Sequence, residues 1–119
     1  VLFDRGSADI GVAGKLQLDT ISNVLKDISQ KIPEDINWVL RVDGHTDKIP
    51  VSQNSVFLDN WELSQARSLS VVKYMINTHE INPKRLSAAG FGEYQPISSS
   101  DSKAALAKNR RIEFKLTER

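Results

Sequence analysis

The sequence predicts a single α/β domain, an α+β sandwich in the order β-α-β-α-β-(short α)-β, with two long helices packed on one face of a mixed sheet. Three observations lead to this fold class. Two long stretches carry apolar residues at helical spacing, and each is followed by a short segment typical of a strand. The C-terminal segment alternates apolar and polar residues, as a strand with one buried face does. The 119 residues fit one domain of common size, so we expect a single domain over 1–119 without an internal linker.

Composition excludes several classes of protein. Apolar residues make up 39% and charged residues 26%, which is ordinary for a globular protein and unlike a disordered one. The net charge is +1, so no overall field draws nucleic acid. Cysteine is absent and the two histidines lie far apart, so we expect no metal site and no cofactor. No apolar run approaches the roughly 20 residues that span a bilayer.

The N-terminal third is predicted to form a strand and a helix. Residues 1–3 are apolar and precede a turn-like segment, so they are read as a first strand. The chain begins within this strand and without methionine, so we expect a fragment of a longer protein. A helix is predicted from about Gly14 to Pro33, which ends it. Its apolar stripe comprises Leu18, Ile21, Leu25, Ile28 and Ile32, widened by Val24.

The middle of the chain is predicted to contain a strand, a long loop and a helix. Residues 38–42 are mostly apolar, which indicates a strand covered on both faces except toward its end. The segment 48–58 has no consistent period. Loops of this length are often functional, and a tolerated surface insertion is the alternative.

The second long helix is predicted from its cap. Asp59 and Glu62 have the spacing of a capping box, and the pattern continues to about Thr78. The predicted buried stripe comprises Leu63, Ala66, Leu69, Val72 and Ile76. Arg67 lies off the centre of this stripe.

The C-terminal third is predicted to contain two strands and a short helix. Asn82 and Pro83 break the preceding pattern, and residues 86–90 form a strand. Gly90 and Gly92 imply unusual backbone. Residues 94–102 form a polar loop, 103–108 a short helix, and the last strand buries Ile112, Phe114 and Leu116.

The candidate site lies where the strand 38–42 runs into a polar loop before the second helix, which is where α/β proteins bind ligands. Asp47 at the strand end can hold a cation, and Arg67 can hold a carboxylate with a planar fork of donors. Such a pair suits a zwitterion. The alternatives are an aspartate that closes a turn and a solvated helix arginine. Trp61 and Tyr94 are candidates either for stacking on sugar rings or for packing.

Four motifs carry a resemblance that covers nearly the whole chain. They are Gly44-His45-Thr46-Asp47, Asn60-x-x-Leu63-Ser64-x-x-Arg67, Arg85-Leu86-Ser87-x-x-Gly90-x-Gly92-x-x-x-Pro96 and Asn109-Arg110-Arg111-Ile112-Glu113. In this order, the motifs resemble the OmpA-like peptidoglycan-binding family, which includes the C-terminal domains of OmpA, Pal and MotB. Within it, the segments 60–64 and 89–94 look most like the MotB-like flagellar stator branch.

The resemblance implies a noncovalent binding module for the stem peptide of peptidoglycan. Asp47 would take the ammonium of diaminopimelate and Arg67 its carboxylate, while Arg110 would reach an acidic group of the peptide. The other implied ligand-binding residues are Thr46, Asn60 and Leu63. The resemblance further implies a periplasmic domain whose membrane anchor lies in the missing N-terminal part of the protein. The whole protein would be a flagellar stator, an outer-membrane protein or a lipoprotein. A homodimer is one possible assembly, and it would gain affinity for the polymer by avidity.

The sequence also bears on three other functions. An enzyme is disfavoured, because His45, Asp47 and Ser64 are triad residue types without a strained nucleophile turn, and Ser64 falls inside a helix. A nucleic-acid module of the same fold class would need exposed aromatic residues and a net basic surface. A protein-interaction domain that has lost the ligand is the remaining alternative.

Overall fold

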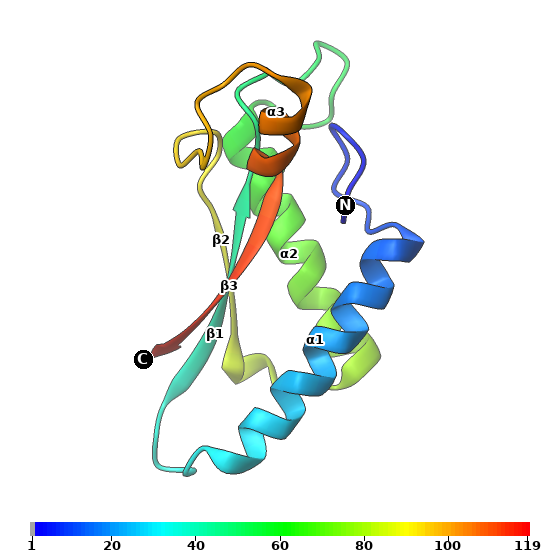
Figure 1. The fold of residues 1–119 in the computed structure, drawn as a ribbon. Coiled ribbons are helices and arrows are strands. Elements are labelled where there is room, and N and C mark those ends of the chain that lie inside the picture. The colour runs from blue at the N-terminus through cyan, green and yellow to red at the C-terminus, as the bar shows by residue number, and fades with distance from the viewer. Residues whose placement is uncertain (1) are drawn as a thin grey trace.

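The computed structural model describes residues 2–119. In chain order its elements are α1 (Val12–Lys31), β1 (Trp38–His45), α2 (Asn60–His79), the 3-10 helix η1 (Pro83–Arg85), β2 (Leu86–Gly90), α3 (Lys103–Asn109) and β3 (Arg111–Glu118). The predicted α+β sandwich is confirmed, because α1 and α2 lie together on one side of a mixed sheet (Figure 1). Within residues 2–119, no helix is both long and apolar enough to cross a membrane.

The sheet has the strand order β2-β1-β3, with β2 parallel and β3 antiparallel to the central strand β1. Val42 of β1 lies between Ala88 of β2 and Phe114 of β3. Residues at alternate positions of β1 face the helices, and Leu40 and Val42 are buried there in the core. The far end of β3 extends beyond this cover, so Leu116, predicted to be buried, is 52% exposed.

The predicted first strand is not a strand of the sheet in the described part of the chain. Phe3 forms only an isolated bridge with Ile10, and residue 1 lies outside the described residues. The chain turns back between them, with Gly6 at a φ of +74°. Phe3 is buried against the core and lies under the guanidinium of Arg67, so this segment packs on α2 and does not extend the sheet.

The buried faces of the two long helices differ in part from the predicted stripes. In α1, Leu18 and Leu25 are buried, whereas Val24 is 52% exposed and Ile28 37% exposed. In α2, Leu69 is 40% exposed. The buried residues of α2 include Leu63 and Val72 of the predicted stripe, but also several polar side chains: Asn60, Ser64, Arg67 and Ser68, followed by Val71 and Met75.

The N-terminal half of α2 lies unusually close to the sheet, which explains these buried polar side chains. A Cβ atom added to Gly44 would overlap the carbonyl oxygen of Ser64, and one added to Gly90 would lie 2.6 Å from the Gln65 nitrogen. Ser64 and Ser68 are fully buried in this contact. Gly90 therefore serves close approach, while Gly92 has the predicted unusual backbone, with a φ of +63°. The contact brings the start of α2 against the end of β1.

The polar end of β1 is buried, although the sequence predicted less cover there. Asp43 is fully buried and receives two hydrogen bonds from Arg41, with donor–acceptor distances of 2.7 and 2.9 Å. His45 is 4% exposed and stacks on Phe91 at a ring-centroid distance of 5.2 Å. These side chains cover the sheet face that the helices leave open.

Candidate functional site

A cavity of about 520 Å³ opens where β1 ends and α2 begins. Its walls come from four segments that are distant in the sequence: the turn after Phe3, the end of β1 with its loop, the first half of α2 and the end of α3. All six residues predicted from the sequence line it: Thr46, Asp47, Asn60, Leu63, Arg67 and Arg110. A volume of this size is typical of pockets for small ligands.

Asp47 is 5% exposed, and its carboxylate is held on both oxygens. Oδ1 accepts a hydrogen bond from the Ile49 backbone N–H at 2.9 Å, which closes a turn. Oδ2 accepts from Nη1 of Arg110 at 2.7 Å. The turn-closing role and the charge-pairing role therefore coexist. Because an ionised carboxylate has about four acceptor positions, Asp47 keeps acceptor capacity for a ligand ammonium.

Arg67 is 3% exposed and is anchored by the N-terminal segment. Nε donates to the Ser7 carbonyl at 2.8 Å, and Nη2 donates to the Asp4 carbonyl at 3.1 Å. The ring of Phe3 lies under the guanidinium, 5.4 Å from centroid to Cζ. Within residues 2–119, Nη1 makes no hydrogen bond and remains a donor for the cavity that Arg67 lines.

Arg67 stays charged at neutral pH despite its burial. Removal from water lowers the pKa of its guanidinium to about 10, with a further lowering by the charge of Arg110 and a small opposing effect of Asp47. A carboxylate placed in the cavity would favour the charged form again. The site therefore gains by binding an anion.

Asn60 ties the start of α2 to the cavity wall. Its Nδ2 lies within hydrogen-bond distance of the Asp47 carbonyl, the Ile49 carbonyl and Oε1 of Glu93, at 3.3, 3.1 and 3.3 Å. Asp59 caps the helix by accepting from the Glu62 N–H, while Glu62 accepts from the Leu58 N–H. In a capping box Glu62 would bond the N–H of Asp59, whereas here it bonds the N–H of Leu58, one residue earlier. These bonds fix the helix start that presents Asn60.

Arg110 and Thr46 complete the polar lining, and Leu63 supplies an apolar patch. Arg110 directly follows α3, where the side chain of Asn109 binds the backbone of Ile97 and Ser98. Thr46 donates its hydroxyl to the Asp47 carbonyl at 2.8 Å. Leu63 is 4% exposed.

Other lining residues gave little sign of a site in the sequence. Arg5 and Gly6 enter through the turn after Phe3, and a lone arginine in a turn carries no signal. The loop 48–58 lines a large part of the cavity, which favours the functional reading of that loop. The loop residues that line the cavity are Ile49, Pro50, Val51, Ser52, Ser55 and Val56. The apolar residues among them are the feature of the sequence that could have indicated a buried or ligand-contacting loop.

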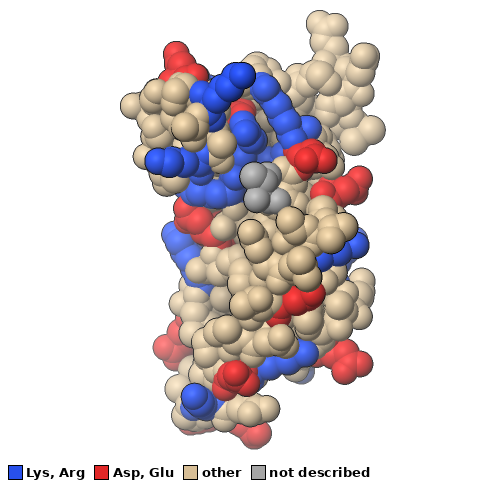
Figure 2. Space-filling model, turned by 45° about the vertical axis from the view of Figure 1, so that its right-hand side comes forward, with Lys and Arg blue, Asp and Glu red and all other residues tan. Residues whose placement is uncertain are grey.

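The cavity is positively charged overall. Its charged lining consists of Arg5, Arg67 and Arg110 against the single carboxylate of Asp47. Figure 2 shows Lys and Arg side chains gathered over the upper half of the visible face. A ligand with more carboxylates than amines fits this balance.

Ser64 and His45, two of the residue types that a hydrolytic triad uses, are not among the residues that line the cavity. Oγ of Ser64 donates to the Trp61 carbonyl and accepts from the Gly92 N–H, so it supports the backbone. His45 is buried, with Nε2 3.8 Å from Glu113. Among residues 2–119, no group of three or more His, Cys, Asp or Glu side chains could hold a metal ion.

Comparisons with known proteins agree with the motifs. The model of the OmpA family matches residues 2–110. Motility protein B of Bacillus subtilis is 34% identical over 113 residues, which are 95% of this chain and 40% of that protein. The probable lipoprotein YiaD of Escherichia coli is 30% identical over 98% of this chain and 48% of its own length. The chain thus spans less than half the length of these relatives.

The fold has close counterparts among solved structures. A MotB-like protein from Desulfovibrio vulgaris superposes with a TM-score of 0.83 at 33% identity, covering 100% of this chain and 68% of that one. The predicted resemblance is confirmed, and MotB periplasmic domains are among the structural neighbours. The chain belongs to the OmpA family.

Proposed function

We propose that the domain binds peptidoglycan noncovalently through the diaminopimelate residue of its stem peptide. Domains of the OmpA, Pal and MotB type generally bind peptidoglycan. The observation that carries the finer proposal is the cavity itself, which brings Asp47 and Arg67 together as buried groups of opposite charge. Diaminopimelate carries an amine and a carboxylate on one side chain, so one group can serve each end.

The existing contacts of both residues suit these roles. Arg67 keeps Nη1 for a ligand carboxylate while two backbone carbonyls hold the rest of its guanidinium in place. Asp47 can add an ammonium to its bonds with Ile49 and Arg110. Arg110 uses one of its five N–H donors on Asp47 and keeps others for a second acidic group of the peptide.

The proposed contacts predict modest affinity. A charge-assisted hydrogen bond contributes about 1.5–3 kcal/mol net, so two of them with some apolar burial give roughly micromolar binding. The loop residues Ile49, Pro50 and Val56, together with Leu63, supply that apolar wall. Weak single sites suit a wall anchor, since several copies or a homodimer on one polymer gain by avidity.

Sedimentation with insoluble cell wall tests this function. The purified domain should pellet with walls that contain diaminopimelate and pellet less with walls that contain lysine, because lysine lacks the side-chain carboxylate. Equal binding to both walls would remove the diaminopimelate account. No binding to either wall would favour the alternative of a protein-interaction domain that has lost the ligand.

We further propose that binding occurs without cleavage. Two observations support this. The Ser64 hydroxyl is hydrogen-bonded to backbone groups, the His45 ring is buried, and neither residue lines the cavity. Incubation with peptidoglycan should release no soluble muropeptides. Release that an Asp47→Asn change abolishes would contradict a binding-only role.

In the cell, we propose that the domain lies in the bacterial periplasm and attaches a longer, membrane-anchored protein to the wall. The similarity to motility protein B and to a probable lipoprotein motivates this. Fractionation of cells that make the full-length protein should place it in the envelope. Recovery in the cytoplasm would contradict the proposal.

A further inference from the structure

Two large aromatic side chains form an exposed stack at the same end of the domain as the cavity. Trp61 and Tyr94 lie with ring centroids 5.0 Å apart and an interplanar angle of 29°. Trp61 is 50% exposed and Tyr94 is 60% exposed. Single exposed apolar residues are common, but a paired aromatic surface is a feature of binding sites.

The backbone under this pair is fixed. Gly92 packs below both rings, since an added Cβ would lie 3.3 Å from Tyr94 and 3.5 Å from Trp61. The Gly92 N–H donates to Oγ of Ser64 at 2.9 Å, and its carbonyl accepts from the Thr46 N–H at 2.9 Å. The aromatic pair is therefore preorganised on the buried part of α2, which lowers the entropic cost of binding.

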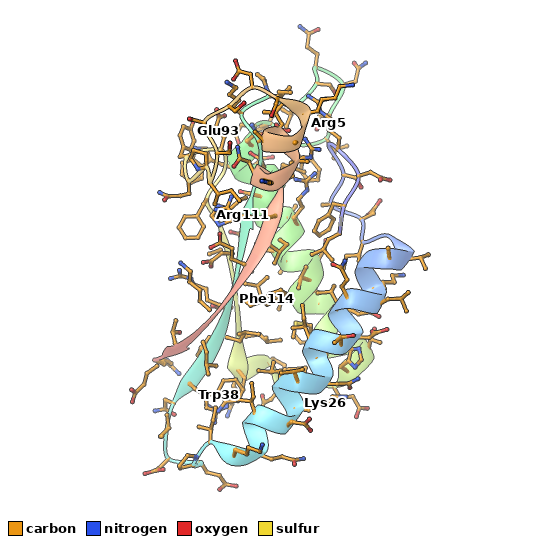
Figure 3. The ribbon with its side chains drawn as sticks, in the orientation of Figure 1. Arg5, Lys26, Trp38, Glu93, Arg111 and Phe114 are labelled. Atoms are coloured by element: carbon orange, nitrogen blue, oxygen red, sulfur yellow. The ribbon has the colours of Figure 1, made fainter. Side chains whose placement is uncertain are left out.

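The pair is continuous with the cavity through neighbours in the chain. Trp61 follows Asn60, and Tyr94 follows Glu93. Nδ2 of Asn60, which lines the cavity, lies 3.3 Å from Oε1 of Glu93. Figure 3 shows Glu93 at the same end of the domain as the cavity residue Arg5, with Trp38 at the opposite end.

We propose that Trp61 and Tyr94 form a subsite for a pyranose ring of the peptidoglycan glycan strand. The flat apolar rings suit the C–H face of a sugar, and the Tyr94 hydroxyl and the carboxylate of the adjacent residue Glu93 can hydrogen-bond its hydroxyl and amide groups. The carboxylate of Glu93 disfavours a nucleic-acid strand, whose phosphates it would repel.

The inference rests on the proposed function, because the stem peptide in the cavity is what brings the glycan to the aromatic pair. A stem peptide is covalently attached to its sugar, so binding of the peptide raises the local concentration of the sugar at a neighbouring surface. The sugar contact then adds affinity without a second independent encounter.

Tryptophan fluorescence tests the sugar contact directly. The chain has two tryptophans, and Trp38 is 5% exposed at the far end, so Trp61 reports a ligand at this surface. A disaccharide-linked stem peptide should produce a saturable emission change in the unchanged protein that the free stem peptide does not produce and that is absent in Trp61→Phe. No change in the unchanged protein, or the same change in Trp61→Phe, would overturn the proposal.

Calorimetric titration separates the sugar site from the peptide site. Trp61→Ala should bind a disaccharide-linked stem peptide about three- to tenfold more weakly than the unchanged protein, with equal affinity for the free stem peptide. The matched control is Leu69→Ala, which removes a 40% exposed apolar side chain from the same helix and should alter neither affinity. Thermal melts of both variants establish that they are folded.

The outcomes distinguish the two proposals. If the unchanged protein binds the free stem peptide, and Trp61→Ala binds the disaccharide-linked peptide as tightly as the unchanged protein, the sugar site is overturned alone. If the unchanged protein binds neither peptide, the proposed function fails, and the sugar site fails with it.

Discussion

The carboxylate of Asp47 and the guanidinium of Arg110 form an ion pair, with Oδ2 and Nη1 2.7 Å apart, although 63 positions separate them in the chain. The pair joins the end of β1 to the residue between α3 and β3. It lies at the cavity wall, where the Asp47 side chain is 6% exposed and the Arg110 side chain 24%. The pair therefore shapes the site as well as lining it.

Removing Arg110 should destabilise the fold, because Asp47 would keep a buried charge without its cation. We expect Arg110→Met to lower the free energy of unfolding by about 1.5–3 kcal/mol. Urea unfolding measures this, with Lys108→Met as a control that removes an exposed cation two positions earlier in the chain, in α3. Equal stability of the two variants would show that the pair contributes nothing to the fold.

Arg67 should have a structural role beside its proposed role in binding. Arg67→Met would leave the carbonyls of Asp4 and Ser7 without their donors and detach the N-terminal segment from α2. We expect the melting temperature to fall by several degrees. Arg5→Met removes an exposed cation from the same cavity and should leave the melting temperature unchanged. If Arg67→Met and Arg5→Met melted at the same temperature, the anchoring role of Arg67 would be contradicted.

Gly44 should tolerate no side chain, because α2 lies directly on it. Gly44→Ala places a methyl group against the Ser64 carbonyl oxygen and the Ser68 hydroxyl, so the helix must shift. We expect a loss of about 1–3 kcal/mol in unfolding free energy, measured with denaturant. Gly11→Ala meets nothing within 4 Å and should cost less than about 1 kcal/mol. The reverse order of the two losses would refute the close contact.

His45 should make stability fall in mild acid. Within residues 2–119 neither ring nitrogen has a hydrogen-bond partner, and burial, followed by the charge of Arg111, lowers the pKa of the ring. The unfolded chain therefore takes up the proton more readily than the folded one. The stability due to neutral His45 is present above a pH of about 6.5 and is lost as the pH falls below it.

Melting temperatures at pH 7.5 and pH 5 check this dependence. The decrease between the two should be smaller in His45→Phe, which keeps a ring against Phe91 and cannot be protonated. Glu113, 3.8 Å from Nε2, has a pKa lowered by Arg111 and stays ionised over this range, so it does not account for the difference. An identical decrease in both proteins would rule out His45 as the group responsible.

Local signals explain why much of the fold could be predicted. Asn82 and Pro83 break the pattern before β2, and the strand occupies 86–90 as predicted. Asp59 accepts from the Glu62 N–H as a capping residue should, and α2 begins at Asn60. In these segments the backbone conformation follows from residues a few positions apart.

The predictions that failed depended on contacts distant in the sequence. The apolar character of residues 1–3 predicts a strand, but Phe3 packs under Arg67, 64 positions later. Arg67 lies off the centre of the predicted stripe, yet it is 3% exposed, because carbonyls from the N-terminal turn compensate for its burial. Motif order brings the six proposed site residues together as candidates, whereas the pairing of Asp47 with Arg110 is visible only in the fold.

Arg67 is proposed to bind the carboxylate that distinguishes diaminopimelate from lysine. Calorimetric titration of the unchanged protein with two stem peptides that differ only at this residue should show about ten- to a hundredfold tighter binding of the diaminopimelate peptide. In Arg67→Met, held below its melting temperature, that preference should disappear. Equal affinity of the unchanged protein for both peptides, or an undiminished preference in folded Arg67→Met, would contradict the account.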